Sequence, residues 1–266
     1  MSAQRILYPD PYPFPVPASD PPHTIQAVTL PDGSSVRVWV LDPSRPRGRI
    51  LVCHGYYASY LQVLGIADGL RRRGFQVLAM ELRGHGERPG PCTLGVREAL
   101  DGETIVRWAG SREGSRTLPT GLLGVSMGAA AMCQVAARVP EVRAVVVDSI
   151  YSRLFPVLRD AIRQQYHLPE LPWAWVTWWS LELTLRKRLS AVDPIALAPR
   201  LRQPLLAIQG GEDRRVSPEM GRQFYERWAG PKEWWFEPGV AHVGMFTKHP
   251  EVYCDRVATF FDRTLA

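Results

Sequence analysis

The sequence predicts an α/β fold built on a doubly wound, mainly parallel sheet, and three observations lead to that prediction. Short apolar runs alternate with longer helical stretches along most of the chain, the order expected when helices connect parallel strands. The chain has 266 residues, of which 45% are hydrophobic, enough to bury both faces of one large sheet. The pentapeptide Gly124-Val125-Ser126-Met127-Gly128 joins an apolar run to an Ala-rich segment, which indicates a strand, a tight turn and a helix.

The N-terminal residues 1–23 are predicted to form a proline-rich arm outside the sheet. Prolines at positions 9, 11, 13, 15, 17, 21 and 22 favour an extended polyproline II conformation. We expect the arm to pack on the domain rather than to bind a proline-recognising partner. Residues 24–30 and 35–41 alternate apolar and polar side chains around Asp32-Gly33, which predicts an antiparallel hairpin at one edge of the sheet.

The core is predicted to comprise residues 24–150 and 191–266. Apolar runs predict the remaining strands at 49–53, 75–80, 120–125, 142–147, 204–209 and 232–236. Helices are expected at 61–73, 96–108, 127–139, 217–228 and 251–264, with a short helix beginning at Asp193-Pro194. Parallel strands end at a common edge, so we expect the loops that follow them to form the functional site.

Residues 151–190 are predicted to form a helical lid inserted between two strands, with tryptophans at 173, 175, 178 and 179. Three interpretations of these rings are open. One is that they pack the lid onto the body of the domain. The others are that they form an apolar wall for part of a substrate, or that the lid touches lipid with the cations at 186–188 at its polar end. On the second interpretation, Trp175 and Trp178 line the substrate pocket together with Tyr57.

Ser126 stands at the turn of the pentapeptide, where the chain reverses sharply between strand and helix. A Cβ on either flanking glycine would collide with the neighbouring strand or helix. The serine side chain is therefore expected to protrude above the edge of the sheet. The amide of Met127 is expected to point from the helix N-terminus toward negative charge that develops on a carbonyl under attack.

Asp213 and His242 also follow predicted strands, in the chain order Ser126, Asp213, His242. A serine hydroxyl needs an imidazole to accept its proton, and the imidazole needs a carboxylate to fix its tautomer. These residue types at one edge of the sheet therefore predict nucleophilic catalysis by Ser126. Asp148, which also ends a strand, is the alternative to Asp213 as the acid.

Five short motifs lie at the ends of the predicted strands. They are His54-Gly55, ELRGHG at 81–86, GVSMG at 124–128, GGEDRRV at 210–216 and GVAHVGMF at 239–246. With these motifs the chain resembles the serine hydrolases of the α/β-hydrolase superfamily, in particular the lidded serine-aminopeptidase-like and monoacylglycerol-lipase-like esterases. Glu81 stands where that family commonly has Asp, and we expect it to affect how its loop is anchored. His54 and His85 are also expected to anchor loops rather than to act as bases.

The resemblance implies an α/β-hydrolase fold with an inserted helical lid, in which Ser126, Asp213 and His242 form a catalytic triad. It also implies that the backbone amides of Tyr56 and Met127 form the oxyanion hole, and it implies no metal or organic cofactor. The expected function is cleavage of carboxylic esters of hydrophobic acyl groups through an acyl-enzyme on Ser126. An aminopeptidase or amidase, or a thioesterase or acyltransferase, is an alternative on the same residues. A non-catalytic interaction protein is the alternative of another class.

Composition argues against several other classes. The net charge is +6, but the basic residues are spread along the chain, so nucleic-acid binding is not expected. Four cysteines lack C-x-x-C spacing, which predicts buried thiols of a cytoplasmic protein rather than a metal site or disulfides. No signal peptide is recognisable, and acidic residues and prolines interrupt the apolar stretch at 168–185. The expected partner is therefore a small-molecule ester, without stable membrane insertion, and the oligomeric state is open.

Overall fold

The computed structural model describes residues 3–9, 20–112, 118–166 and 169–266. The described chain contains one eight-stranded sheet. Its strands are β1 (Thr24–Thr29), β2 (Ser35–Leu41), β3 (Arg49–Cys53), β4 (Gln76–Met80), β5 (Thr120–Val125), β6 (Val142–Asp148), β7 (Leu205–Gly210) and β8 (Lys232–Glu237). Each lies at or within a few residues of a predicted strand.

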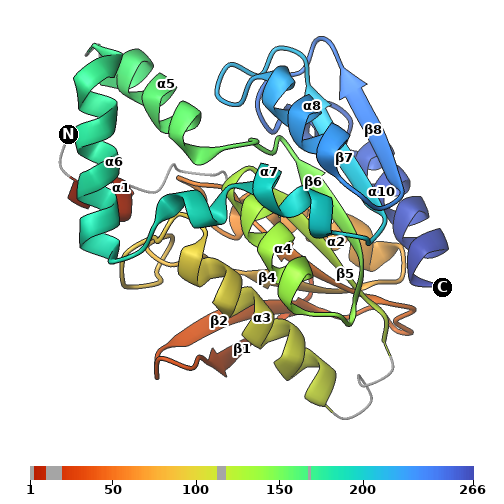
Figure 1. Ribbon diagram of the computed structural model, residues 1–266. Coiled ribbons are helices and arrows are strands. Elements are labelled where there is room, and N and C mark those ends of the chain that lie inside the picture. The colour runs from red at the N-terminus through yellow and green to blue at the C-terminus, as the bar shows by residue number, and fades with distance from the viewer. Residues whose placement is uncertain (1–2, 10–19, 113–117, 167–168) are drawn as a thin grey trace.

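The strands lie side by side in the order β1-β2-β4-β3-β5-β6-β7-β8, with helices on both faces of the sheet (Figure 1). β2 is antiparallel to both β1 and β4, and the pairs from β4 to β8 are parallel. The sheet is thus mainly parallel and doubly wound, with the hairpin at its edge, as predicted. β5 lies between β3 and β6 near the middle of the sheet, which brings Ser126 to the centre of the edge where the parallel strands end.

The helices follow the predicted order and add two short ones. They are α1 (Ala3–Leu7), α2 (Leu61–Arg72), α3 (Val96–Ser111), α4 (Met127–Arg138), α5 (Leu154–Tyr166), α6 (Glu170–Leu185), α7 (Pro194–Leu197), α8 (Pro218–Arg227), α9 (Gly244–Lys248) and α10 (Pro250–Leu265). Alternate side chains of each strand face opposite helical layers. In β3, Leu51 and Cys53 belong to the core shared with α3 and α4, whereas Ile50 and Val52 belong to the core shared with α2 and α10.

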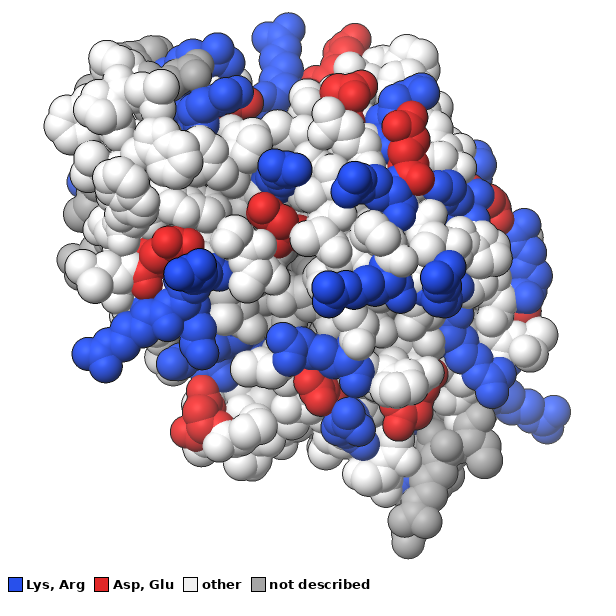
Figure 2. Space-filling view, in the orientation of Figure 1, with Lys and Arg blue, Asp and Glu red and all other residues white. Residues whose placement is uncertain are grey.

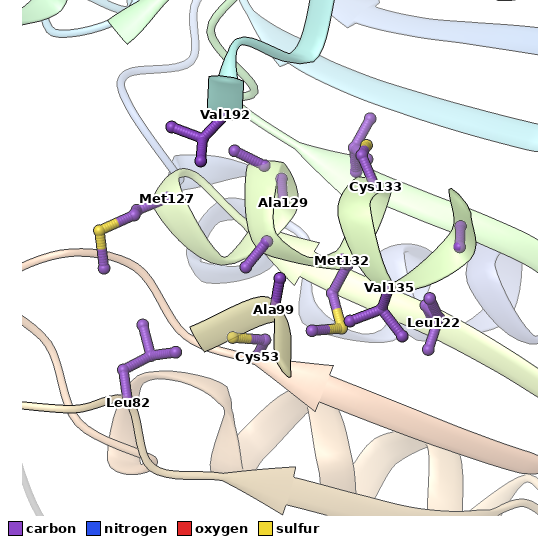
Figure 3. Close-up of a cluster of buried hydrophobic side chains, with 14 of the residues drawn as sticks. Cys53, Leu82, Ala99, Leu122, Met127, Ala129, Met132, Cys133, Val135 and Val192 are labelled. Atoms are coloured by element: carbon purple, nitrogen blue, oxygen red, sulfur yellow. The ribbon is translucent and has the colours of Figure 1, made fainter. Parts of the chain in front are cut away.

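The first of these cores packs α4 closely onto the sheet. Figure 3 shows Met132 and Val135 of α4 beside Cys53 of β3 and Leu122 of β5, and all four side chains are fully buried. Cys53 is one of four buried free cysteines, as predicted. This packing fixes the helix whose first residue follows Ser126.

The N-terminal segment differs from the prediction where the structure describes it. Residues Ala3–Leu7 form α1, so the expected extended conformation is wrong for these residues. The sequence AQRIL contains no proline and suits a helix, whereas the prolines at 11, 13, 15 and 17 lie outside the described residues. Ile6 and Leu7 are buried, and the carbonyl of Leu7 accepts a 2.7 Å hydrogen bond from the amide of Cys92. This part of the segment therefore packs against the domain.

Two helices, α5 and α6, lie between β6 and α7 in the chain and project to one side of the sheet layers (Figure 1). They contact each other, and α6 also contacts α1. Leu154, Val157, Leu158 and Ala161 of α5 are one helical turn apart along one side of that helix, toward the loops that follow β3 and β5. Among the described residues, no helix has both the length and the apolarity that a membrane span requires.

Candidate active site

The turn between β5 and α4 holds Ser126 in a strained conformation. Ser126 has φ 53° and ψ −116°, a positive φ that side chains other than glycine seldom adopt. A Cβ on Gly124 would lie 2.5 Å from the Cα of Ala129, and a Cβ on Gly128 would lie 2.4 Å from the carbonyl oxygen of His54. Both clashes are with backbone atoms, so both positions require glycine for the predicted steric reason.

The structure brings Ser126, His242 and Asp213 together in one hydrogen-bonded chain. Ser126 Oγ lies 3.1 Å from His242 Nε2, and His242 Nδ1 lies 2.7 Å from Asp213 Oδ2. The imidazole thus carries its proton on Nδ1, donates it to the carboxylate, and presents Nε2 as acceptor to the serine hydroxyl. His242 is partly buried in the loop after β8, and Asp213 is 4% exposed in the loop after β7.

Both oxygens of the Asp213 carboxylate accept hydrogen bonds. Its Oδ1 accepts hydrogen bonds from the amides of Arg215 (2.9 Å) and Val216 (2.8 Å). Its Oδ2 accepts from Gln209 Nε2 (3.3 Å) as well as from His242. Four donors therefore fix the orientation of the carboxylate that faces the imidazole.

Asp148, the alternative acid, contacts the same loop in another way. Its Oδ1 accepts a 2.9 Å hydrogen bond from Ser149 Oγ, and that oxygen in turn accepts a 3.0 Å bond from the amide of Val243. Asp148 is 1% exposed, and burial raises its pKa to about 6, against the smaller opposing effects of Ser149 and Tyr253. Asp213 is the carboxylate that hydrogen-bonds His242. Asp148 instead supports Val243, the residue after His242, through the hydroxyl of Ser149.

Two backbone amides were predicted as oxyanion donors, those of Met127 and Tyr56. Met127 is the first residue of α4 and lies in the cavity lining beside Ser126, as Tyr56 does. The neighbouring amide of Tyr57 has another acceptor, because it lies 3.3 Å from His85 Nε2. The Tyr56 side chain is fixed by a 2.7 Å hydrogen bond from its hydroxyl to the carbonyl of Ile6 in α1.

The two histidines expected to anchor loops make backbone hydrogen bonds. His54 Nδ1 lies 2.7 Å from the carbonyl of Gly55, and its Nε2 accepts from the amide of Leu82 at 3.0 Å. His85 Nδ1 lies 2.8 Å from the carbonyl of Arg83. Burial lowers the pKa of His85 to about 3, so its ring is neutral and its Nε2 can accept from Tyr57.

Carboxylates complete the anchoring of the loop at 81–88. Glu81 is 2% exposed and accepts a 3.0 Å hydrogen bond from the amide of Tyr60. Asp101 is 1% exposed and accepts from both Arg83 and Arg88 at 2.7 Å. The departure at Glu81 therefore falls on a residue that joins two loops of the site.

A cavity of about 380 Å³ opens beside Ser126. Most of its lining is apolar: Ile6, Tyr56, Tyr57, Leu94, Met127, Tyr151, Leu154, Val157, Leu158, Ala161, Trp178, Leu181, Leu189 and Val216. Tyr57 and Trp178 lie where they were expected. Trp175 does not line this cavity, so its predicted place in the pocket is corrected. Its side chain is 43% exposed, and its ring packs obliquely on that of Phe155, with 4.3 Å between the ring centroids. Trp178 and Leu181 lie on the buried side of α6, whereas Trp175 lies beside it on the exposed side with Trp179.

The contribution of α5 to this cavity was not predicted from the sequence. Its apolar residues recur at i, i+3, i+4 and i+7, the spacing of a single helical face: Leu154, Val157, Leu158 and Ala161. That periodicity was a usable signal. The contribution of Ile6, in contrast, has no local signal and depends on where α1 packs.

A second, wider hollow lies on the other side of Ser126 and His242. It is lined by residues of the loop after β3 and of the loop around His242, together with Gln62 of α2, Arg215 of the loop after β7 and Phe246 of α9. Ser126 therefore stands between an apolar cavity under α5 and α6 and a more open region between α2 and α9.

Similarity to known proteins identifies the superfamily. The model of a family described as serine aminopeptidase, S33, matches residues 44–157. The solved esterase Pf2001 of Pyrococcus furiosus has TM-score 0.77 and 25% identity, and the similarity covers 97% of each chain. The chain is an α/β hydrolase.

This α/β hydrolase is also 25% identical over 233 residues to the uncharacterized protein YqkD of Bacillus subtilis (strain 168), across 86% of this chain and 76% of that one. A dienelactone hydrolase from Anabaena variabilis shares the fold with TM-score 0.67 at 18% identity, across 93% of this chain and all of that one (100%). The similarities confirm the predicted superfamily and its serine-aminopeptidase-like branch, and they make the protein a hydrolytic enzyme.

Proposed function

We propose that this enzyme hydrolyses carboxylic esters with Ser126 as nucleophile. The observation that carries the proposal is the hydrogen-bonded chain from Ser126 Oγ through His242 to Asp213, which ends at an apolar cavity. The similarity to the Pyrococcus furiosus esterase favours the same activity. A serine within hydrogen-bond reach of an oriented imidazole is the arrangement that acyl transfer requires.

In the proposed reaction, Ser126 Oγ attacks the acyl carbonyl while its proton moves to His242 Nε2. The imidazolium then gives this proton to the leaving alcohol, and an acyl-enzyme on Ser126 remains. Water that loses a proton to His242 hydrolyses the acyl-enzyme and restores the serine. Asp213 stabilises the positive ring through the bond to Nδ1 in both steps.

The proposed oxyanion hole combines the amides of Met127 and Tyr56. The Met127 amide belongs to the N-terminus of α4, where the helix dipole favours negative charge. Its contribution would grow as the carbonyl oxygen becomes an oxyanion, which is the property of a group that stabilises the transition state. The His85 bond to Tyr57 would hold the adjacent peptide in place.

The cavity lining favours a hydrophobic acyl group over the charged amine of an aminopeptidase substrate. Among its described lining residues, the carboxylate is that of Asp160, and it lies 3.3 Å from Arg159 and 3.8 Å from Arg163. An aminopeptidase needs a carboxylate that can pair with the substrate's ammonium group. Asp160 already faces two guanidinium groups, so the ester is the better supported substrate.

The test is hydrolysis of p-nitrophenyl esters from acetate to dodecanoate, with an aminoacyl p-nitroanilide in parallel. We expect ester turnover that falls about 10⁴-fold or more in Ser126→Ala, with unchanged thermal stability. The acyl length with the highest kcat/KM would report the room in the cavity. Near-wild-type turnover by Ser126→Ala would contradict the mechanism, and activity on the anilide alone would assign the enzyme to the peptidases.

A further inference from the structure

Helix α6 is apolar around most of its circumference. Its inner side is buried, with Ala174 and Leu181 fully covered and Trp178 7% exposed. Its outer side chains are exposed instead, and we call them the outer face of α6: Leu171, Trp173, Trp175, Val176, Trp179 and Leu183. A helix that is apolar on all sides is normally buried on all sides. The outer face therefore indicates a surface that is covered when the protein works.

The outer face is continuous rather than scattered. Trp175, Trp179 and Leu183 follow one another at intervals of four residues, so they form one stripe along the helix. Leu171 precedes this stripe at a residue whose backbone angles are not helical. The exposed fractions of Trp175, Trp179 and Leu183 are 43%, 62% and 80%. Single exposed apolar residues are common on soluble proteins, whereas a contiguous stripe of this kind marks an interaction site.

Three exposed cations adjoin the C-terminal end of the stripe. They are Arg186, Lys187 and Arg188, and none forms an ion pair with a carboxylate of the described chain. Glu182 is the acidic residue between 171 and 188, and its Oε1 accepts a 2.8 Å hydrogen bond from the amide of Leu189. In Figure 2 the surface over α6, on the left, is largely uncharged, and blue side chains gather below it.

We propose that the outer face of α6 binds an anionic lipid surface. Tryptophan and leucine side chains on such a face enter the boundary between headgroups and acyl chains, and adjacent cations bind anionic headgroups. The stripe supplies the first kind of contact and Arg186, Lys187 and Arg188 supply the second. The net charge of +6 adds a longer-range attraction to the same surface.

A second copy of the chain fits the outer face less well. An identical face would place uncharged stripe against uncharged stripe, and each copy would bring its three cations at 186–188 to a helix whose sequence holds two glutamates, Glu170 and Glu182. A lipid surface satisfies both parts of the face at once. Because Trp178 and Leu181 on the inner side line the cavity beside Ser126, the same helix would lie between the lipid and the site.

The experiment is co-flotation of the full chain with vesicles of phosphatidylcholine alone or with one third phosphatidylglycerol. We expect binding to the anionic vesicles that weakens as salt is added, in the wild type and equally in Ser126→Ala. The double variant Trp179→Ser/Leu183→Ser should lose at least about tenfold in partitioning. Lys187→Gln/Arg188→Gln should lose roughly 25-fold on anionic vesicles, about fivefold for each cation removed.

Matched controls come from surfaces remote from α6. Val252, an apolar residue on α10, is 56% exposed. Arg138, the last residue of α4, and Arg143, near the start of β6, are also exposed. Val252→Ser and Arg138→Gln/Arg143→Gln should bind anionic vesicles as the wild type does. Absence of wild-type binding, or binding that the stripe variant leaves unchanged, would overturn the proposal. Loss of a wild-type dimer in the stripe variant, without vesicle binding, would assign the face to a second copy instead. Because Ser126→Ala must bind normally, these outcomes are separate from failure of the proposed esterase activity.

Discussion

The hydroxyl of Ser149 accepts a 3.0 Å hydrogen bond from the amide of Val243, the residue that follows His242. Ser149 lies just after β6, and it donates in turn to the carboxylate of Asp148. The loop that carries His242 is thus held from two neighbouring strands, by Asp213 after β7 and by Ser149 after β6. Asp213 orients the imidazole directly, and Ser149 positions the backbone next to it.

The first prediction concerns Ser149→Ala. Loss of the bond to Val243 leaves the His242 loop free to shift relative to Ser126, so we expect kcat for an ester to fall about five- to tenfold, the factor for one hydrogen bond of about 1 kcal/mol. Ser152→Ala is the matched control, because Ser152 is buried and donates to Gln223 at 3.3 Å instead. Steady-state kinetics of the two variants test the expectation. Equal kcat values in both variants would show that Ser149 has no positioning role.

The second prediction separates the two strand-end carboxylates. Asp213→Asn should lower kcat about 10³- to 10⁴-fold, because the amide no longer stabilises the required tautomer and charge of His242. Asp148→Asn keeps an acceptor for Ser149 and should leave kcat within a few-fold of the wild type. Kinetics on one ester decide the matter. Comparable losses in both variants would make Asp148 part of the catalytic machinery.

Asp148→Asn should also change how stability depends on pH. Burial raises the pKa of Asp148 from 3.8 in the unfolded chain to about 6, so the folded state binds the proton more tightly. Protonated Asp148 therefore makes its full contribution to the stability of the folded state below pH 4. This contribution is lost as the pH rises toward 6 and the carboxyl ionises. At pH 8 the ionised carboxylate costs about 3 kcal/mol, which Asp148→Asn removes. Urea unfolding should show the variant as more stable than the wild type at pH 8, and a difference between the two proteins that is the same at pH 4 and pH 8 would contradict this linkage.

The third prediction concerns Gly128, two residues after Ser126. Gly128→Ala would place a Cβ 2.4 Å from the backbone oxygen of His54 and 2.5 Å from that of Cys53. We expect it to lose about 3 kcal/mol of stability, because neither backbone can move away. Gly110→Ala in α3 meets nothing within 4 Å and should gain about 0.5 to 1 kcal/mol. Thermal unfolding of both variants measures the difference, and similar shifts would mean that the turn tolerates a side chain.

The fold and the Ser126 turn are predictable because their signals are local. Apolar runs and their boundaries predict the strands, and two glycines around a serine indicate the sharp turn whatever surrounds it. The partner of His242 is less predictable, because Asp148 and Asp213 both end parallel strands. The choice depends on loop conformation: the amides of residues 215 and 216 close around Asp213 and turn it toward the imidazole.

Two other features depend on tertiary packing. Helix α6 has no polar side, so its sequence cannot show that Trp178 faces the cavity and Trp175 faces outward. Near the N-terminus the prolines dominate the pattern, and the short helix that brings Ile6 to the cavity has no comparable local signal. The predicted boundaries of the arm and of the lid, at residues 23 and 151–190, stay predictions.

The most direct measurement is labelling of the wild type and of His242→Ala by a fluorophosphonate, followed by peptide mass spectrometry. If His242 activates Ser126, the wild type should carry one adduct per chain, on the peptide that contains Ser126, and the variant should react at least about 10³-fold more slowly. An adduct on another residue, or equal labelling rates in the two proteins, would contradict the account.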